Sequence, residues 1–333
     1  MKKIVVFGAT GNLGAYTSIH LKELGYDVHA VGYRASDNGF FKSKGITYYS
    51  LDITDSTSFK TLPKEIYGIV HLAGKLPSRS DYNPKALISS IMLGTINVLD
   101  YMVSAGGKRI VFPQTPYDQY QKHNTPNIIK ADDPRTFPLT GDHSVYTIAK
   151  NAAIDLIDHY AATYDFKRFH LRFFTIYNYH PDPYHFADFK RKMMPYRMLM
   201  DRAQKSLDIE VWGDSSRSKE MVYVKDFTQV VERCFESDAP GGIYNVGGKA
   251  VSLEEQIDGI IEVFSPTGAP SKKIYKPNMP DPRLLKLDIS KTESELGYSQ
   301  KYSYLDSLKD FRKDMENEPF ALLWGKKEDF IED

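Results

Sequence analysis

The chain of 333 residues carries 43 lysine and arginine residues against 43 aspartate and glutamate residues, so its formal net charge is zero. This balance argues against a nucleic-acid or anionic-membrane binder, which usually shows an excess of basic residues. Its single cysteine, Cys234, excludes an internal disulfide and favours a reducing, cytoplasmic setting.

Short apolar segments alternate with longer amphipathic ones through the first half of the chain. Segments typical of buried strands are KIVVFG, DVHAVGY, YGIVHLAG and KRIVFPQ, and segments typical of helices are GAYTSIHLKELG, PKALISSIMLGTINVLDYMVSAG and HSVYTIAKNAAIDLIDHYAATYD. The alternation predicts an α/β fold of the Rossmann type, a doubly wound parallel sheet with helices on both faces. No stretch approaches the ~18 apolar residues of a membrane span. After Tyr177 the alternation ends, so we expect a second region to start there.

The first predicted strand runs directly into the segment GATGNLG, which has G-x-x-G-x-x-G spacing. In a strand-to-helix turn, missing side chains let a pyrophosphate approach the positive end of the next helix. We therefore expect this turn to bind a dinucleotide through Gly8, Thr10, Gly11, Asn12, Leu13 and Gly14. The alternative is a tight turn that binds nothing.

The second predicted strand, DVHAVGY, ends without an acid and is followed by Arg34. An acid at this position would accept a hydrogen bond from the ribose 2′-hydroxyl of NAD, whereas a cation suits the 2′-phosphate of NADP. NAD remains an alternative, because Asp37 lies nearby and Arg34 could equally be a solvated surface residue. The sequence thus predicts NAD(P) as cofactor, with a slight preference for NADP.

The segment YTIAK holds Tyr146 and Lys150 four residues apart, on one face of a predicted helix. A phenol has a pKa near 10, and a nearby ammonium group or an oxidised nicotinamide ring favours its phenolate. Tyr146 can then exchange a proton with a substrate hydroxyl or carbonyl. The alternative is a tyrosine and a lysine of no consequence on an ordinary helix.

Together with LDITD, HLAG, VWGDSSRSKEMVYVKD, IYNVGG and DISKTESELGY, these segments resemble, in order and over nearly the whole chain, the motifs of the extended short-chain dehydrogenase/reductase family. The family contains nucleotide-sugar epimerases, dehydratases and reductases. The resemblance implies that Asp52 and Ile53 lie on the adenine side, that Leu72, Ala73 and Gly74 lie beside the nicotinamide ribose, and that Lys150 also binds this ribose. It further implies a smaller substrate lobe interleaved with the dinucleotide domain. We expect residues 1–177 plus about 221–240 in the dinucleotide domain, and 178–220 plus about 241–333 in the lobe.

The resemblance also implies a third catalytic residue and a set of substrate contacts. The family's catalytic serine or threonine falls on Thr115, and the family's diphosphate-binding cations fall on Lys219 and Arg283. We expect substrate contacts from Thr115, His143, Thr175, Lys219 and Arg283. The helices over 84–104 and 145–163 have broad apolar faces, which this family pairs into a homodimer.

Departures from the family pattern narrow the reaction. Family members that dehydrate a sugar carry an Asp-Glu pair after the catalytic threonine, where this chain has Pro116 and Tyr117. We interpret Tyr117 and Tyr120 as packing residues, and we predict a nucleotide-sugar 4-epimerase rather than a 4,6-dehydratase. The family's asparagines are replaced at Ile91 and Thr175, which leaves the identity of the sugar open.

Three alternatives remain open. One is an NADPH-dependent reductase of 4-keto sugars or other carbonyls, and another is an enzyme of this family that acts on a small hydroxy-ketone. The third is a non-catalytic dinucleotide sensor similar to the NmrA-like proteins, which would be expected to lack the Tyr146 and Lys150 pair. His180 and His185 lack the spacing of metal ligands, so no metal is predicted.

Overall fold

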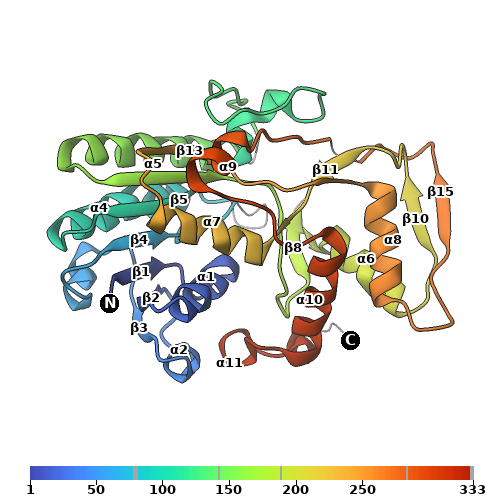
Figure 1. The fold of residues 1–333 in the computed structure, drawn as a ribbon, viewed down its shortest axis with the longest axis horizontal. Helices are drawn as coiled ribbons and strands as arrows, with labels where there is room; N and C mark the ends of the chain where they lie inside the picture. Colours follow the sequence, from blue (N-terminus) through green and yellow to red (C-terminus); the bar gives the residue numbers. More distant parts are fainter. Residues whose placement is uncertain (78–81, 142, 188–189, 283, 331–333) are drawn as a thin grey trace.

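The computed structural model describes residues 1–77, 82–141, 143–187, 190–282 and 284–330. Within these ranges one parallel sheet has the strand order β3-β2-β1-β4-β5-β6-β13 (Figure 1). Its strands are β1 (Lys3–Phe7), β2 (Asp27–Gly32), β3 (Thr47–Ser50), β4 (Gly68–His71), β5 (Arg109–Gln114), β6 (Lys167–Arg172) and β13 (Gly241–Asn245). The strand order reverses between β1 and β4, and sheets of this kind bind ligands at the carboxyl ends of the strands on either side of such a reversal. The predicted doubly wound α/β fold is confirmed.

Helices cover both faces of this sheet. They are α1 (Asn12–Glu23), α2 (Phe40–Ser43), η1 (Ser56–Thr61), α3 (Pro84–Ile88), η2 (Ser89–Leu93), α4 (Gly94–Ser104), η3 (Pro116–Lys122), α5 (Ser144–Tyr164) and α7 (Val224–Glu236). Alternate residues of β1 serve the two faces, because successive side chains of a strand point to opposite sides. Ile4 and Val6 belong to the core under α1 and α7, whereas Val5 and Phe7 belong to the core under α4 and α5.

The last strand of the sheet lies beyond the boundary that we expected. β13 pairs in parallel with β6, from Gly241 opposite Arg168 to Asn245 opposite Arg172. Pairing at Gly241 is so close that a Cβ there would lie 2.0 Å from the Arg168 carbonyl oxygen. The large sheet therefore includes Gly241–Asn245, directly after the position near residue 240 where we expected this part of the domain to end.

The second lobe is built from short two-stranded sheets and helices (Figure 1). The strand pairs are β7 (Ile176–Tyr177) with β12 (Val222–Tyr223), β8 (Tyr184–Ala187) with β9 (Lys190–Met193), β10 (Ile209–Trp212) with β15 (Lys273–Lys276), and β11 (Ser218–Glu220) with β14 (Ala250–Ser252). Its helices are α6 (Pro195–Gln204), α8 (Leu253–Phe264) and α10 (Tyr304–Asn317). The same part of the chain also supplies α9 (Ser290–Leu296), which packs against β13 and α7, α11 (Ala321–Trp324), which bonds to residues of the large domain, and η4 (Lys327–Phe330).

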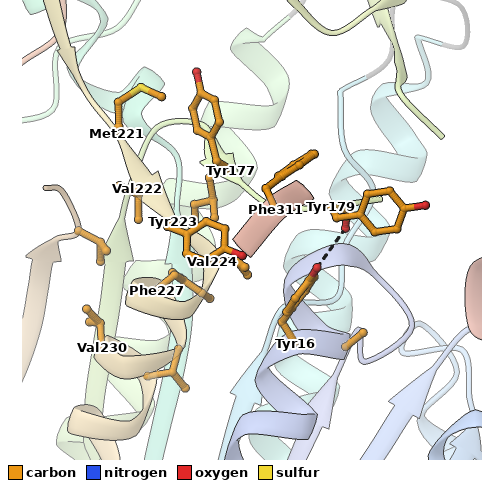
Figure 2. Close-up of a cluster of buried hydrophobic side chains, with 14 of the residues drawn as sticks. Tyr16, Tyr177, Tyr179, Met221, Val222, Tyr223, Val224, Phe227, Val230 and Phe311 are labelled. Atoms are coloured by element: carbon orange, nitrogen blue, oxygen red, sulfur yellow. Dashed lines mark hydrogen bonds between the residues drawn. The ribbon is translucent and has the colours of Figure 1, made fainter. Parts of the chain in front are cut away.

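Helix α10 connects the two regions through buried tyrosines. Tyr16 of α1 donates a hydrogen bond to Asp314 at 2.8 Å and lies 3.4 Å from the Tyr179 carbonyl oxygen. Tyr223 donates to Asp310 at 2.5 Å. Figure 2 shows Tyr16 directed toward Tyr179, in the cluster that also contains Phe311 of α10. The carboxylates of one helix thus anchor it to α1 and to β12.

The stretch Pro84–Ser104, from α3 through η2 to α4, is long and apolar enough to cross a membrane by length and composition. This differs from the sequence prediction, which found no such stretch. In the fold, Val98, Leu99 and Met102 are buried in the core that α4 shares with α5. Packing against the sheet accounts for the apolar character of these residues.

Candidate active site

Two of the three glycines in the β1–α1 turn are required by the packing of the fold. Gly8 has φ +80°, and a Cβ there would lie 2.7 Å from the Ala73 nitrogen. A Cβ on Gly14 would lie 2.1 Å from the Gly8 carbonyl oxygen. These positions allow the turn to lie against the end of β4 and α1 to lie against the turn.

Gly11 is different, because the fold has room for a side chain there. A Cβ on Gly11 would meet only the Gly8 carbonyl oxygen, at an ordinary 3.4 Å. Gly11 is exposed and precedes the first turn of α1, which contains no acidic residue. The positive end of a helix therefore faces an open approach, a geometry that suits an anionic group such as a pyrophosphate. The exposed Asn12 and the half-buried Leu13 follow in the same turn.

Two charged side chains after β2, Asp37 and Arg34, are held by hydrogen bonds to the backbone. The Asp37 carboxylate accepts hydrogen bonds from the backbone nitrogens of Gly39 at 3.2 Å and Phe41 at 2.7 Å, so it caps α2. Arg34 is exposed, and its Nη1 donates to the Leu323 carbonyl oxygen at 2.6 Å. Asp37, the acid that kept NAD possible in the sequence analysis, is thus engaged in hydrogen bonds to the backbone. Arg34, the cation that favours NADP, lies near the end of β2.

The other predicted cofactor residues follow strands that end at the same edge of the sheet. Asp52 and Ile53 come just after β3, and Leu72, Ala73 and Gly74 come just after β4. The Asp52 carboxylate accepts from the Thr54 backbone nitrogen at 2.9 Å. Leu72 and Ala73 lie against Gly8, so the segment after β4 is brought to the glycine turn.

The proposed catalytic residues gather at the end of β5. Lys150 is buried in α5, and its Nζ donates to the Pro113 carbonyl oxygen at 3.0 Å. The same atom lies 4.2 Å from the ring centre of Phe112 and 5.9 Å from that of Tyr146. Thr115 is buried directly after β5, and its hydroxyl oxygen accepts from the Tyr117 nitrogen at 3.3 Å. The Thr115 proton is therefore left to donate to another acceptor.

Burial disfavours the charged forms of Lys150 and Tyr146 and shifts the pKa values of both groups. It lowers the pKa of the Lys150 ammonium group to about 7. It also raises the pKa of the Tyr146 phenol, and the neighbouring Tyr117 adds to this rise. The protein alone therefore holds Tyr146 protonated and makes Lys150 easy to deprotonate. The phenolate form considered in the sequence analysis is not favoured by the chain's own groups.

A buried polar network fixes the turn that carries Thr115. Gln114 accepts from the Thr115 nitrogen at 2.8 Å and donates to Asn151 at 2.7 Å and to Asp118 at 3.1 Å. Asp118 also pairs with Arg172 at 2.7 Å, and the side chains of both are fully buried. Sequence reasoning missed this network, because its members come from three segments that are far apart along the chain.

Tyr117 packs against other aromatic rings, as predicted, and it also lies beside Tyr146. Its ring stacks on that of His143, with centres 4.1 Å apart and planes 24° apart. It also stacks on Tyr120 at 6.1 Å, and it is close enough to Tyr146 to raise the pKa of that phenol. An aromatic wall formed by Tyr117 and His143 therefore stands beside Tyr146. Tyr120 is 47% exposed, so it lies at the outer edge of this wall.

The other predicted substrate residues are Lys219 and Arg283, which were predicted for the diphosphate, and Thr175. Lys219 is half-buried in β11 and forms an isolated parallel bridge with Leu285. Arg283 lies outside the described residues. Thr175 is exposed between β6 and β7. Within the described ranges, no group of three or more His, Cys, Asp or Glu residues is placed to hold a metal ion.

A glycine turn where the strand order of a doubly wound sheet reverses, with a tyrosine and a lysine one helical turn apart beside β5, is the arrangement of a dinucleotide-dependent α/β enzyme. A family model described as the NAD dependent epimerase/dehydratase family matches residues 4–247. The chain belongs to this family, as its motifs predicted, and is an enzyme of the NAD-dependent epimerase and oxidoreductase class.

Relatives and solved structures agree with this assignment. The chain is 25% identical over 311 residues to a putative UDP-glucose 4-epimerase of Methanocaldococcus jannaschii, covering 92% of this chain and 96% of the relative. It shares its fold with the UDP-glucose 4-epimerase of Thermotoga maritima, solved with UDP-glucose, at a TM-score of 0.73 and 21% identity over 94% of this chain and 99% of that one. The UDP-glucuronic acid 4-epimerase of Bacillus cereus, solved with NAD, gives a TM-score of 0.70 at 20% identity, with coverage of 94% and 99%.

Proposed function

We propose that this protein is a nucleotide-sugar 4-epimerase that acts through transient hydride transfer. The observation that carries the proposal is the gathering of Thr115, Tyr146 and Lys150 at the end of β5, on the edge of the sheet where the glycine turn lies. The names of the similar proteins, among them UDP-sugar 4-epimerases, support the same reaction.

The glycine turn fits a nicotinamide dinucleotide. Gly11 leaves space in front of α1, and the free N–H groups of the first helical turn point toward that space. When bound there, the dinucleotide supplies the acceptor and donor of a hydride. Arg34 at the end of β2 supports a preference for NADP over NAD, because Asp37 is engaged in capping α2.

Proton transfer falls to Tyr146. Its hydroxyl is held in the protonated form by burial, so it needs a cation nearby to act as a base on the sugar 4-hydroxyl. Lys150 supplies this cation when it is protonated. Thr115 donates its proton to the same sugar oxygen and holds it in place. The same Tyr146 then returns the proton when the hydride reaches the other face of the sugar.

The chain lacks the groups that a dehydratase needs next to Thr115. Pro116 and Tyr117 carry no carboxylate, and the nearest acid, Asp118, is fully buried against Arg172. A side chain so engaged is poorly placed to protonate a leaving hydroxyl or to remove a C5 proton. The aromatic wall of Tyr117 and His143 supports a different role for this segment, as an apolar surface against which a sugar ring can pack.

Arg34 also favours a second candidate, an NADPH-dependent reductase of 4-keto sugars. A reductase uses the same three residues but releases its oxidised cofactor after each turnover. Tighter binding of NADP(H) than of NAD(H) would fit a reductase that takes up NADPH for each turnover.

We also propose that the enzyme works as a homodimer. Exposed apolar side chains occur on α3, η2 and α5, which pack against one another. They are Ile88 at 44%, Leu93 at 47% and Ile148 at 42% exposure. A patch of this kind on neighbouring helices suits a twofold interface.

The proposal is tested by incubating the purified protein with a panel of UDP-, GDP-, dTDP- and CDP-hexoses and following the products by proton NMR. An epimerase converts one sugar nucleotide to its 4-epimer with no added dinucleotide. Conversion only with NADPH, which is consumed, would assign the reductase. Dinucleotide binding with no conversion of any sugar would favour a non-catalytic sensor.

A further inference from the structure

The C-terminal helix α11 lies across the dinucleotide-binding edge of the large domain. Three consecutive residues of this helix bond to that edge. Leu322 accepts from Asn38 at 3.0 Å, Leu323 accepts from Arg34 at 2.6 Å, and the Trp324 indole N–H donates to the Thr10 carbonyl oxygen at 2.9 Å. The helix therefore contacts both the glycine turn and the segment that follows β2.

Aromatic packing holds α11 in this position. Trp324 is 5% exposed and stacks on Phe320 with ring centres 4.4 Å apart. Phe320 in turn lies 4.5 Å from Tyr16, one turn into α1. The ring centre of Trp324 also lies 4.6 Å from that of His180, in the segment that leads into the second lobe. A side chain so fully enclosed is a fixed part of the fold.

The contacts of α11 continue toward the predicted ribose site. Thr10, whose carbonyl accepts from Trp324, lies against Gly32 at the end of β2: a Cβ on Gly32 would be 2.7 Å from the Thr10 methyl group. Leu323 holds one guanidinium nitrogen of Arg34, and this exposed side chain keeps its other N–H groups for a ligand. Backbone carbonyls thus restrict a cation that would otherwise be mobile, which reduces the entropy lost when it binds an anion.

We infer that α11 is part of the dinucleotide site and that Trp324 is a positioning residue that sets the preference for the 2′-phosphate of the dinucleotide. The inference rests on the proposed use of a nicotinamide dinucleotide. Trp324 acts through Thr10 and, by keeping α11 in place, through Arg34. It makes no contact with the reacting atoms.

The test measures the affinities of the full-length protein for NADP⁺ and NAD⁺ by calorimetry. Trp324→Ala should bind NADP⁺ about tenfold more weakly, with a smaller loss for NAD⁺, so that the ratio of the two affinities falls. Trp324→Phe keeps a stacking ring but removes the N–H donor, so it should show a smaller fall in the same direction. Leu322→Ala is the matched control, because this side chain is 56% exposed and its backbone carbonyl is retained. It should keep the parent ratio.

A purely structural role for Trp324 would lower thermal stability and leave the affinity ratio unchanged, and that result would overturn the inference. If Trp324→Ala does not fold, the ratio measured for Trp324→Phe decides in the same way. If the parent protein binds neither dinucleotide, the proposed function fails and this inference fails with it. If the parent binds and both variants keep its ratio, the inference alone fails.

Fluorescence gives an independent measurement. The chain has two tryptophans, and Trp212 in β10 is 43% exposed in the second lobe. In a Trp212→Phe background, all tryptophan emission comes from Trp324. Saturation with NADPH should quench this emission, because the indole is bonded to the glycine turn. Unchanged emission at saturation would overturn the placement of α11 in the site.

Discussion

Lys150 is buried under the end of β5, and burial lowers the pKa of its ammonium group to about 7. In the unfolded chain this pKa returns to its ordinary value near 10.4. Between these two values the unfolded chain binds more protons than the folded one, so the Lys150 contribution to the free energy of unfolding should rise with pH across this window. The rise is on the order of 1.4 kcal/mol per pH unit.

Lys150→Met should lack this rise. Urea denaturation of both proteins at pH 7 and pH 9 measures it, with the difference between parent and variant removing the effect of the other titrating groups. The parent should gain about 2–3 kcal/mol relative to the variant between these pH values. The same change in the free energy of unfolding for both proteins would contradict the assignment of Lys150 as a neutral buried amine at high pH.

The catalytic role of Tyr146 can be tested by removing its hydroxyl group. Tyr146→Phe should keep the fold and the dinucleotide affinity, and should lower kcat by a factor of about 10² or more, because the proton-transfer group is lost. Tyr160→Phe is the matched control: it lies on the same helix, and its hydroxyl bonds to Asp100 at 2.8 Å, far along α5 from Lys150. Turnover in Tyr146→Phe equal to that of the control would exclude Tyr146 as acid and base.

At the scale of elements, the turn after β5 depends on the buried pair of Asp118 and Arg172. Asp118→Ala removes the carboxylate that neutralises the buried Arg172, whose remaining partners are neutral oxygens, and this costs roughly 3–5 kcal/mol of stability. The exposed pair of Asp155 and Arg135, at 2.7 Å, is the matched control. Asp155→Ala should cost less than about 1 kcal/mol, because solvent screens that pair. Equal losses in chemical denaturation would show that the buried pair does not hold the turn.

The sequence predicted those helices, strands and turns that are determined by residues close together in the chain. Alternation of apolar runs predicted the parallel sheet, and the spacing of Gly8, Gly11 and Gly14 predicted the first turn. The sequence could not reveal that Gly11 alone has room for a side chain, because this depends on distances to Gly8 and to the end of β4. It also could not reveal the role of α11, because Trp324 and Thr10 are 314 residues apart. The stack of Tyr117 on His143 depends in the same way on the path of the loop between them.

At the scale of the whole molecule, two copies of the chain should associate through α3, η2 and α5. Ile148→Asp places a charge on the exposed apolar patch that also contains Ile88 and Leu93. Sedimentation should show a dimer for the parent and a monomer, or a much weaker dimer, for the variant, because a buried unpaired charge opposes association. A matched change at another exposed apolar residue, Leu207→Asp, 44% exposed and just past the end of α6, should leave the dimer intact. A parent that sediments as a monomer would contradict the proposed assembly.

The central claim is that the protein moves one hydride and one proton at C4 of a nucleotide sugar. It is tested most directly by following the reaction with a UDP-hexose in D₂O by proton NMR, with no dinucleotide added. A hydride held on the protein returns to the same carbon, so we predict the 4-epimer with its C4 proton fully retained and with no 4-keto-6-deoxy product. Deuterium at C4 of the epimer would mean that the hydrogen left as a proton, and a 4-keto-6-deoxy sugar would mean that C5 had been deprotonated. Either result would contradict the claim.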